Sequence, residues 1–130
     1  MARYDHLPIY RAAFDLAVHM ERIVREFSRY HKYTLGTELR NCSRGILKMI
    51  IEANGSKERG AMLLKIREEL EWLKVLSRLC HESACFSGIK IYIHISEKVI
   101  DISKQNEGWI KQTIKRSSGR AGHGQNQKGN

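Results

Sequence analysis

The stretch TLGTELRNCSRGILKMIIEANGS, Thr34 to Ser56, contains a complete amphipathic helix together with both of its ends. Its large apolar residues recur every three or four positions, which is the period of one helical face. They are Leu35, Leu39, Cys42, Ile46, Met49, Ile50 and Ala53. Thr34 is placed to cap the first turn through its hydroxyl, and the run Asn-Gly-Ser is a stop signal. The stretch therefore predicts a helix over residues 35–53.

Three further segments of the chain show the helical period. They cover about residues 7–29, 57–81 and 88–115. Pro8 suits the first turn of the first segment, where its missing N–H costs no hydrogen bond. The run SRYHKYT, residues 28–34, breaks the pattern and is expected to form a loop.

The run IKIYIHI, residues 89–95, can be interpreted in two ways. Its alternation of isoleucine with other residues is typical of a strand, and isoleucine favours β structure. However, Ile89, Ile93 and Ile100 also keep helical spacing, as do Val99, Ile110 and Ile114. A single strand would have no partner in this chain, so the context favours a helix.

Four helical segments with short connections, in a chain of 130 residues, predict one all-α domain. Only one proline is present, which disfavours a turn-rich β fold. We expect an antiparallel up-down-up-down four-helix bundle over residues 1–116. Residues 117–130 are rich in glycine, serine and polar side chains and are expected to form a disordered basic tail.

The chain is basic, with a formal net charge of +9. No acid follows Glu107, whereas several bases do, namely Lys111, Lys115, Arg116, Arg120 and Lys128. Such an excess indicates nucleic acid or another polyanion as a partner, although a basic protein without such a partner is the plain alternative. Three cysteines, with no signal peptide and no long apolar run, predict a cytoplasmic protein without membrane contact.

Catalytic and metal-binding motifs are not recognisable in the sequence. It has no glycine-rich phosphate loop and no nucleophile elbow, and Glu68 and Glu69 have lysine and arginine neighbours that suggest ion pairs. Cys80, His81 and Cys85 lack a second ligand pair at zinc-site spacing. Cys42 and Cys80 fall on apolar faces and are better interpreted as core residues. The expectation is a protein that is not an enzyme and has no metal or cofactor.

Two lines of cations are the candidate binding residues. The first is Arg40, Arg44 and Lys48, with no acid between them on their helix. The second is Arg67, Lys74 and Arg78, where Glu71 could bridge Arg67 and Lys74. Both are candidates for contacts with phosphates or a protein partner. Neither line contains an aromatic residue for base stacking, so weak sequence specificity is expected.

The helical segments carry more apolar surface than one bundle core requires. A second line on the third segment consists of Leu64, Trp72, Val75 and Leu79. Smaller extra lines are Leu7, Phe14 and Val18 on the first segment, and Leu47 and Ile51 on the second. Such lines favour self-association, with Leu64, Trp72, Val75 and Leu79 as the oligomer interface. The alternative is that wide core stripes wrap further round each helix.

Five short motifs occur in one order along residues 7–112. They are LPIY, HKYTLGTELR, IIEAN, LEWLKVLSRLCHE and GWIKQ. In that order they resemble the accessory variability determinant (Avd) family of diversity-generating retroelements. The four-helix proteins encoded in ribosomal RNA intervening sequences are the nearest similar group.

The resemblance implies more than the residues do on their own. It implies a homopentameric barrel of four-helix bundles with a positive surface. It also implies a non-catalytic protein that binds RNA and DNA and associates with a retroelement reverse transcriptase. Such a protein would support mutagenic retrohoming, the error-prone copying of a template repeat. The alternative function is a structural scaffold, or an intervening-sequence-type protein, without a nucleic-acid role of its own.

Overall fold

The chain forms four long helices and one short helix in the computed structural model, which describes residues 4–128 and the side chains of residues 4–117. The helices are α1 (Pro8–Arg25), α2 (Arg29–Lys32), α3 (Leu35–Asn54), α4 (Arg59–Glu82) and α5 (Ile89–Lys128). Residues 4–128 include no strand, so the prediction of an all-α protein is confirmed.

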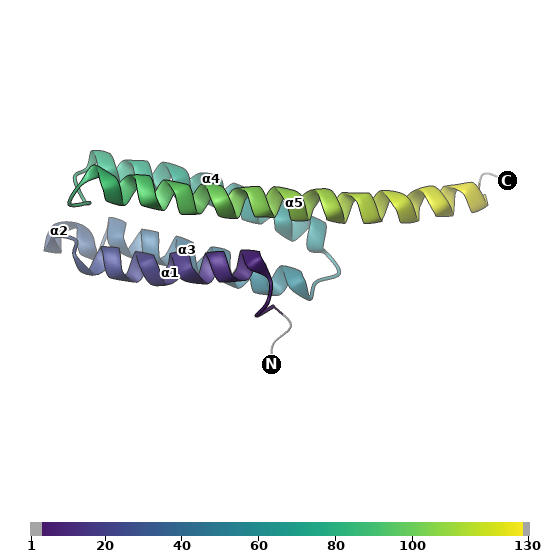
Figure 1. Cartoon of the computed structure of the whole chain (residues 1–130), viewed down its shortest axis with the longest axis horizontal. Helices are drawn as coiled ribbons and strands as arrows, with labels where there is room; N and C mark the ends of the chain where they lie inside the picture. The colour runs from purple at the N-terminus through teal and green to yellow at the C-terminus, as the bar shows by residue number, and fades with distance from the viewer. Residues whose placement is uncertain (1–3, 129–130) are drawn as a thin grey trace.

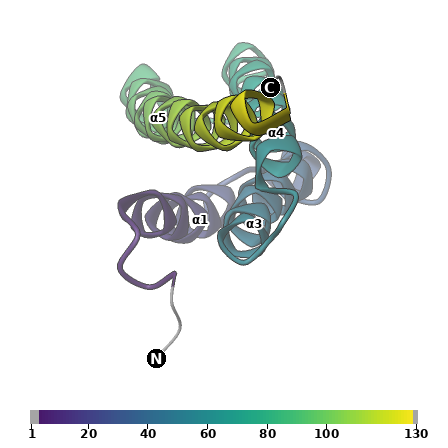
Figure 2. The same cartoon turned by 90° about the vertical axis from the view of Figure 1, so that its right-hand side faces the viewer.

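The four long helices are arranged in two layers. α1 and α3 lie side by side in one layer, and α4 and α5 form the other (Figure 1, Figure 2). Contacts between neighbours close a ring from α1 to α3, to α4, to α5 and back to α1. The short helix α2 contacts α3 at the end of the bundle where α4 passes into α5 (Figure 1).

The core is built from one buried face of each long helix, as the helical period predicts. Its largest fully buried side chains are Leu16, Met20, Leu39, Ile46, Ile50, Leu63, Ile66, Leu70, Leu73, Leu76, Ile95 and Ile102. The polar residue Asn106 is also fully buried. Its Nδ2 donates a hydrogen bond to the carbonyl oxygen of Leu63 at 3.0 Å, which ties α5 to α4 at that level.

The chain between α1 and α3 differs from the prediction. The first helix was expected to reach Arg29, but α1 ends at Arg25. The predicted loop at residues 28–34 contains the helix α2, so that prediction was wrong for Arg29–Lys32. Phe27 is buried against the core and anchors the turn between the two helices. Residues 26–28 therefore form a break between α1 and α2. Burial of Phe27 holds this break against the core, and the chain starts a new helical turn after it.

Thr34 precedes α3, as predicted, but its side chain does not cap the helix. Its hydroxyl Oγ1 instead lies 3.2 Å from the carbonyl oxygen of Tyr30 and 3.3 Å from that of His31, and donates to them. The prediction of a hydroxyl cap was wrong because the carbonyls at the end of α2 compete for the same side chain. The hydroxyl thus joins α2 to the start of α3.

The run IKIYIHI is helical and forms the first turns of α5, so the strand alternative was wrong. The isoleucines and valine whose spacing predicted this helix are divided between a buried face and an exposed face. Ile95, Val99, Ile102 and Ile110 are in the core, whereas Ile89, Ile93, Ile100 and Ile114 are exposed. The sequence could not distinguish these two faces, because isoleucines occupy both.

α5 continues to Lys128, beyond its predicted end near residue 115, and extends past the other helices (Figure 1). The division of the chain into a bundle domain, residues 1–116, and a disordered tail, residues 117–130, stays a prediction. Residues 129 and 130, and the side chains from residue 118 onward, lie outside the part that the structure describes.

Gly36, in the first turn of α3, lies where three helices meet. A Cβ atom at this position would come within 2.7 Å of Val24 Cγ1 on α1, and within 3.2 Å of the His31 carbonyl oxygen on α2. Glycine is therefore required for close packing, because a side chain here would collide with a buried valine and with backbone. Gly45, two to three turns later on α3, has no such neighbour within 4 Å.

The substitution Gly36→Ala is expected to destabilise the protein by up to about 2 kcal/mol. The collision costs about 1–3 kcal/mol, and the higher helix propensity of alanine offsets about 1 kcal/mol of it. Gly45→Ala is the matched control and should raise stability by about 0.5–1 kcal/mol. Urea unfolding of both variants measures the difference. Equal stability of the two variants would show that α1 and α2 do not hold Gly36 closely.

Candidate nucleic-acid interface

The cation line on α3 lies beside α1. Arg40 Nε donates a hydrogen bond to Glu21 Oε2 at 2.8 Å, and Arg44 Nη1 lies 3.8 Å from Glu21 Oε1. Arg44 also donates to Asn41 Oδ1 at 2.7 Å. Lys48 is exposed, and no ion pair to it forms within residues 4–117.

The expectation that no acid neutralises the α3 line was wrong. Glu21 belongs to α1 and lies beside these cations only because α1 packs against α3. The sequence of α3 alone therefore does not predict this pairing. One carboxylate, paired with two of the three cations, still leaves the line with a surplus of positive charge. Because the pairs are half-exposed, they are weak enough for phosphate oxygens to compete with them.

The cation line on α4 lies beside α5 instead. Arg67 makes a two-point contact with Glu107 of α5, from Nε to Oε2 at 3.0 Å and from Nη2 to Oε1 at 2.8 Å. Lys74 Nζ donates to Glu71 Oε1 at 2.8 Å. Glu71 therefore pairs with Lys74, as expected, but Glu107 replaces it at Arg67. Arg78 is exposed, and no ion pair to it is formed by the side chains of residues 4–117.

The structure does not combine the two cation lines into one surface. The first adjoins α1 in one layer, whereas the second adjoins α5 in the other layer (Figure 2). A hollow of about 190 Å³ lies along the second line, and Arg67, Lys74 and Glu107 are among the residues lining it. The acids Glu71 and Glu107 form part of the lining of that hollow. The cation line on α3, which pairs only with Glu21 among the described side chains, therefore carries the larger surplus of positive charge.

The second apolar line of α4 is exposed, as expected. Leu64, Trp72, Val75 and Leu79 each keep 45% or more of their surface open to solvent. The smaller lines differ, because Leu7 and Leu47 pack against the core and so belong to wide core stripes. Phe14 on α1 remains exposed. The extra apolar line that stays fully uncovered is therefore the one on α4, and exposed isoleucines lie on the neighbouring helix α5.

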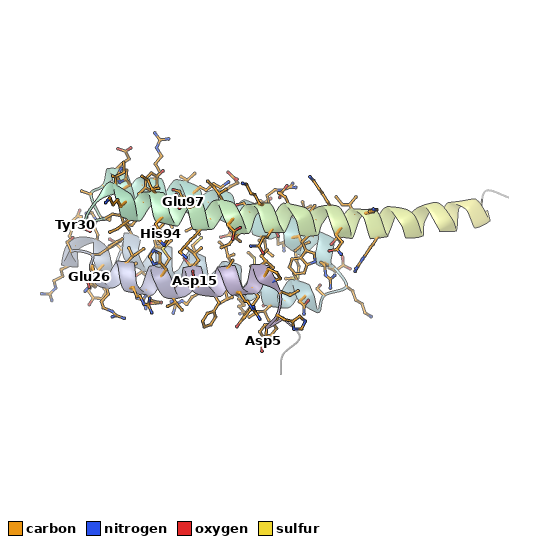
Figure 3. The ribbon with its side chains drawn as sticks, viewed as in Figure 1. Asp5, Asp15, Glu26, Tyr30, His94 and Glu97 are labelled. Atoms are coloured by element: carbon orange, nitrogen blue, oxygen red, sulfur yellow. The ribbon has the colours of Figure 1, made fainter. Side chains whose placement is uncertain are left out.

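A pair of histidines lies between α1 and α5. His19 and His94 rings meet edge to face with centroids 4.7 Å apart, beside the ion pair of Asp15 with Lys98 (Figure 3). Burial lowers the pKa of His19, and His94 and Lys98 lower it further. The hydrogen bond from Lys98 lowers the pKa of Asp15. Both shifts follow from close helix packing.

The three cysteines are free and buried, and they are placed for packing. Burial raises the pKa of Cys42 and of Cys80 to about 12, so neither thiol ionises appreciably near neutral pH. Within residues 4–117 no group of three potential ligands is arranged to hold a metal ion. No helix among the described residues is both long and apolar enough to span a membrane.

Together these features define a small, basic, all-helical bundle with an uncovered apolar helix face. Compared with models of known protein families, the chain matches the bAvd-like family over residues 11–113. The chain therefore belongs to the bAvd-like family, and the resemblance to Avd proteins is confirmed. A search of curated proteins finds no match to it.

Proposed function

We propose that this chain is a non-catalytic, nucleic-acid-binding accessory protein of a retroelement reverse transcriptase, acting in mutagenic retrohoming in the cytoplasm. The observation that carries the proposal is the bAvd-like family match, which spans from α1 to the part of α5 that packs on the bundle. The protein handles template RNA and its DNA copy, and the polymerase chemistry belongs to the partner. It has no cofactor and no membrane partner.

The charge of the chain supports the nucleic-acid part of the proposal. A net charge of +9 gives long-range attraction for a polyanion. Arg40, Arg44 and Lys48 are the first candidates for phosphate contacts, and Arg67, Lys74 and Arg78 are the second. Binding through such contacts releases counterions, so affinity should fall steeply as salt rises.

The proposal includes an antiparallel up-down-up-down bundle that forms a homo-oligomer, with a pentamer favoured by the resemblance alone. Two contacts between α4 and α5 support opposite helix directions: Leu63 contacts Asn106 near one end, and His81 stacks on Tyr92 near the other. The uncovered line Leu64, Trp72, Val75 and Leu79 supports self-association, because monomers seldom expose such a face.

A structural scaffold without a nucleic-acid role is the second candidate. It is favoured by the ion pairs of Arg40, Arg67 and Lys74 with acids of the same chain, since these cations already have partners. A scaffold of this kind, like an intervening-sequence-type protein, would show no salt-dependent complex with RNA or DNA.

Charge reversal on α3 tests the proposal. The triple variant Arg40→Glu, Arg44→Glu and Lys48→Glu should abolish binding in a gel-shift at low salt and leave the assembly intact. In a salt titration of the wild type, these residues should account for about 2–3 units of the log–log slope of affinity if all three contact phosphates. The matched control Lys57→Glu, Lys90→Glu and Lys104→Glu makes the same charge change at exposed sites outside both lines.

The two triple variants separate the possible results. Loss of binding only in the α3 variant supports a phosphate site on that helix. Equal loss in both variants would mean that net charge alone drives binding. Unchanged affinity of the α3 variant removes α3 from the interface, and a wild-type protein that ignores RNA and DNA at low salt favours the scaffold.

A further inference from the structure

Two tyrosines at the α2 end of the bundle are unusually exposed. Tyr30 keeps 82% of its surface open to solvent and Tyr33 keeps 72%, the highest values among the exposed large hydrophobic residues of the described chain. Figure 3 shows Tyr30 at this end, near Glu26. Neither ring is needed by the core, so their exposure has no structural explanation in the bundle itself.

Cations from three helices lie at this end of the bundle, and three of them line a hollow together with Tyr33. Arg29 and Lys32 are on α2 itself, Arg25 is at the end of α1, and Arg40 is on α3. No ion pair to Arg25, Arg29 or Lys32 forms within the side chains that the structure describes.

A hollow of about 260 Å³ lies at this corner of the bundle. Arg25, Lys32, Tyr33 and Arg40 line it, together with Glu21 and Val24. Its one acid, Glu21, is already paired with Arg40. The hollow is therefore bounded by Arg25 and Lys32, by the Arg40–Glu21 pair and by the exposed side chain of Tyr33.

The backbone that carries the two tyrosines is held in place. The Lys32 N–H donates to the Ser28 carbonyl oxygen at 2.9 Å, and the Thr34 hydroxyl donates to the Tyr30 carbonyl oxygen. Gly36 allows α3 to approach the His31 carbonyl closely. Because these contacts hold the main chain that carries the rings, a ligand would pay little to order the backbone of this segment.

We propose that this α2 corner, Tyr30 and Tyr33 with Arg25, Arg29, Lys32 and Arg40, binds single-stranded nucleic acid. The tyrosine rings stack on unpaired bases, and the surrounding cations contact the phosphates on either side. The inference rests on the proposed nucleic-acid function and adds a strand preference to it. A duplex keeps its bases stacked and paired, so it offers the tyrosines no base face.

Nucleic acid fits this corner better than a protein partner does. Tyr33 lines the hollow with Arg25, Lys32 and Arg40, and of these three cations only Arg40 has an acid partner among the described side chains. Most of the other uncovered apolar side chains lie on α4 and α5, with Phe14 on α1. Aromatic rings between cations match a chain that alternates base planes with phosphates. The corner shares Arg40 with the cation line on α3, but it adds two aromatic rings that both cation lines lack.

The test compares wild type with Tyr30→Ala/Tyr33→Ala and with Tyr30→Phe/Tyr33→Phe. Each is titrated with single-stranded RNA, single-stranded DNA and a duplex of one sequence, roughly 16 nucleotides long. The alanine variant should bind single strands at least about 10-fold more weakly and the duplex unchanged. The phenylalanine variant should keep wild-type affinity, because it retains the stacking surface. Both side chains are exposed, so circular dichroism should show unchanged helix content.

Each other outcome has a definite meaning. If wild type binds no nucleic acid, the proposed function and this inference fail together. If wild type binds and the alanine variant binds single strands equally well, only this inference is overturned. Equal weakening toward single strands and duplex also overturns it, since base stacking is then not what was lost. Loss of binding to the reverse transcriptase, with nucleic-acid affinity unchanged, would reassign the corner to a protein partner.

Discussion

The double variant Trp72→Glu/Leu79→Glu is expected to be monomeric, with unchanged helix content, where the wild type forms the proposed homo-oligomer. Trp72 and Leu79 lie seven residues apart on the uncovered face of α4, so both would be covered if this face forms the oligomer contact. Two carboxylates buried there without partners would weaken association by more than roughly 100-fold. Light scattering during size-exclusion chromatography measures the particle mass, and circular dichroism measures the helix content.

The control for this experiment is Phe14→Glu. Phe14 is an aromatic side chain with nearly the same exposure as Trp72, but it lies on α1 in the opposite layer. Its substitution should leave the particle mass unchanged. Dissociation by Phe14→Glu alone would move the interface to α1, and an undiminished mass in the Trp72 and Leu79 variant would exclude α4.

The second large effect is expected at two isoleucines in the first turns of α5. Ile95 is fully buried, whereas Ile93 keeps 47% of its surface exposed. Ile95→Ala should cost about 2–5 kcal/mol of unfolding free energy, because it leaves a cavity between helices. Ile93→Ala should stay within about 0.5 kcal/mol of wild type. Urea unfolding, at a protein concentration where both variants have the same oligomeric state, gives the comparison.

This pair of variants also distinguishes the two structures that the run IKIYIHI allows. Residues two apart share one face of a strand but point to different sides of a helix. Similar costs at Ile93 and Ile95 would therefore contradict the helix. A large cost at Ile95 alone agrees with burial of that side chain in the bundle.

Most of the fold could be predicted from the sequence. The reason is that the helical spacing of apolar residues is a pattern among residues that are close together in the chain. The core faces of α1, α3 and α4 follow from such spacing. The face of α5 did not, since Ile93 and Ile95 are equally apolar and only packing decides between them. Thr34 shows the same limit at a helix end, because its hydroxyl had two sets of partners, and the set offered by α2 was visible only in three dimensions.

The candidate site was less predictable than the fold. The cations on α3 could be found from their spacing, but their pairing with Glu21 depends on how α1 packs. Arg67 likewise pairs with Glu107, which is distant in the sequence. Tyr30 and Tyr33 lay in a segment expected to be a loop, so their grouping with Arg25 and Arg40 from two other helices had no signal. Contacts between distant segments set each of these features.

The length of α5 has a mechanical consequence. Its 40 residues extend about 60 Å, whereas the 24 residues of α4 extend about 36 Å. The last turns of α5 therefore project beyond the bundle, and every subunit of an oligomer would have such a projecting helix end. The charged residues in these last turns are all cations. In an oligomer, the projecting ends of α5 should therefore repel one another at low ionic strength. Added salt screens this repulsion, so the ends should come closer together as ionic strength rises. The particle would then have a hydrodynamic radius that shrinks on adding salt, without any change in its mass.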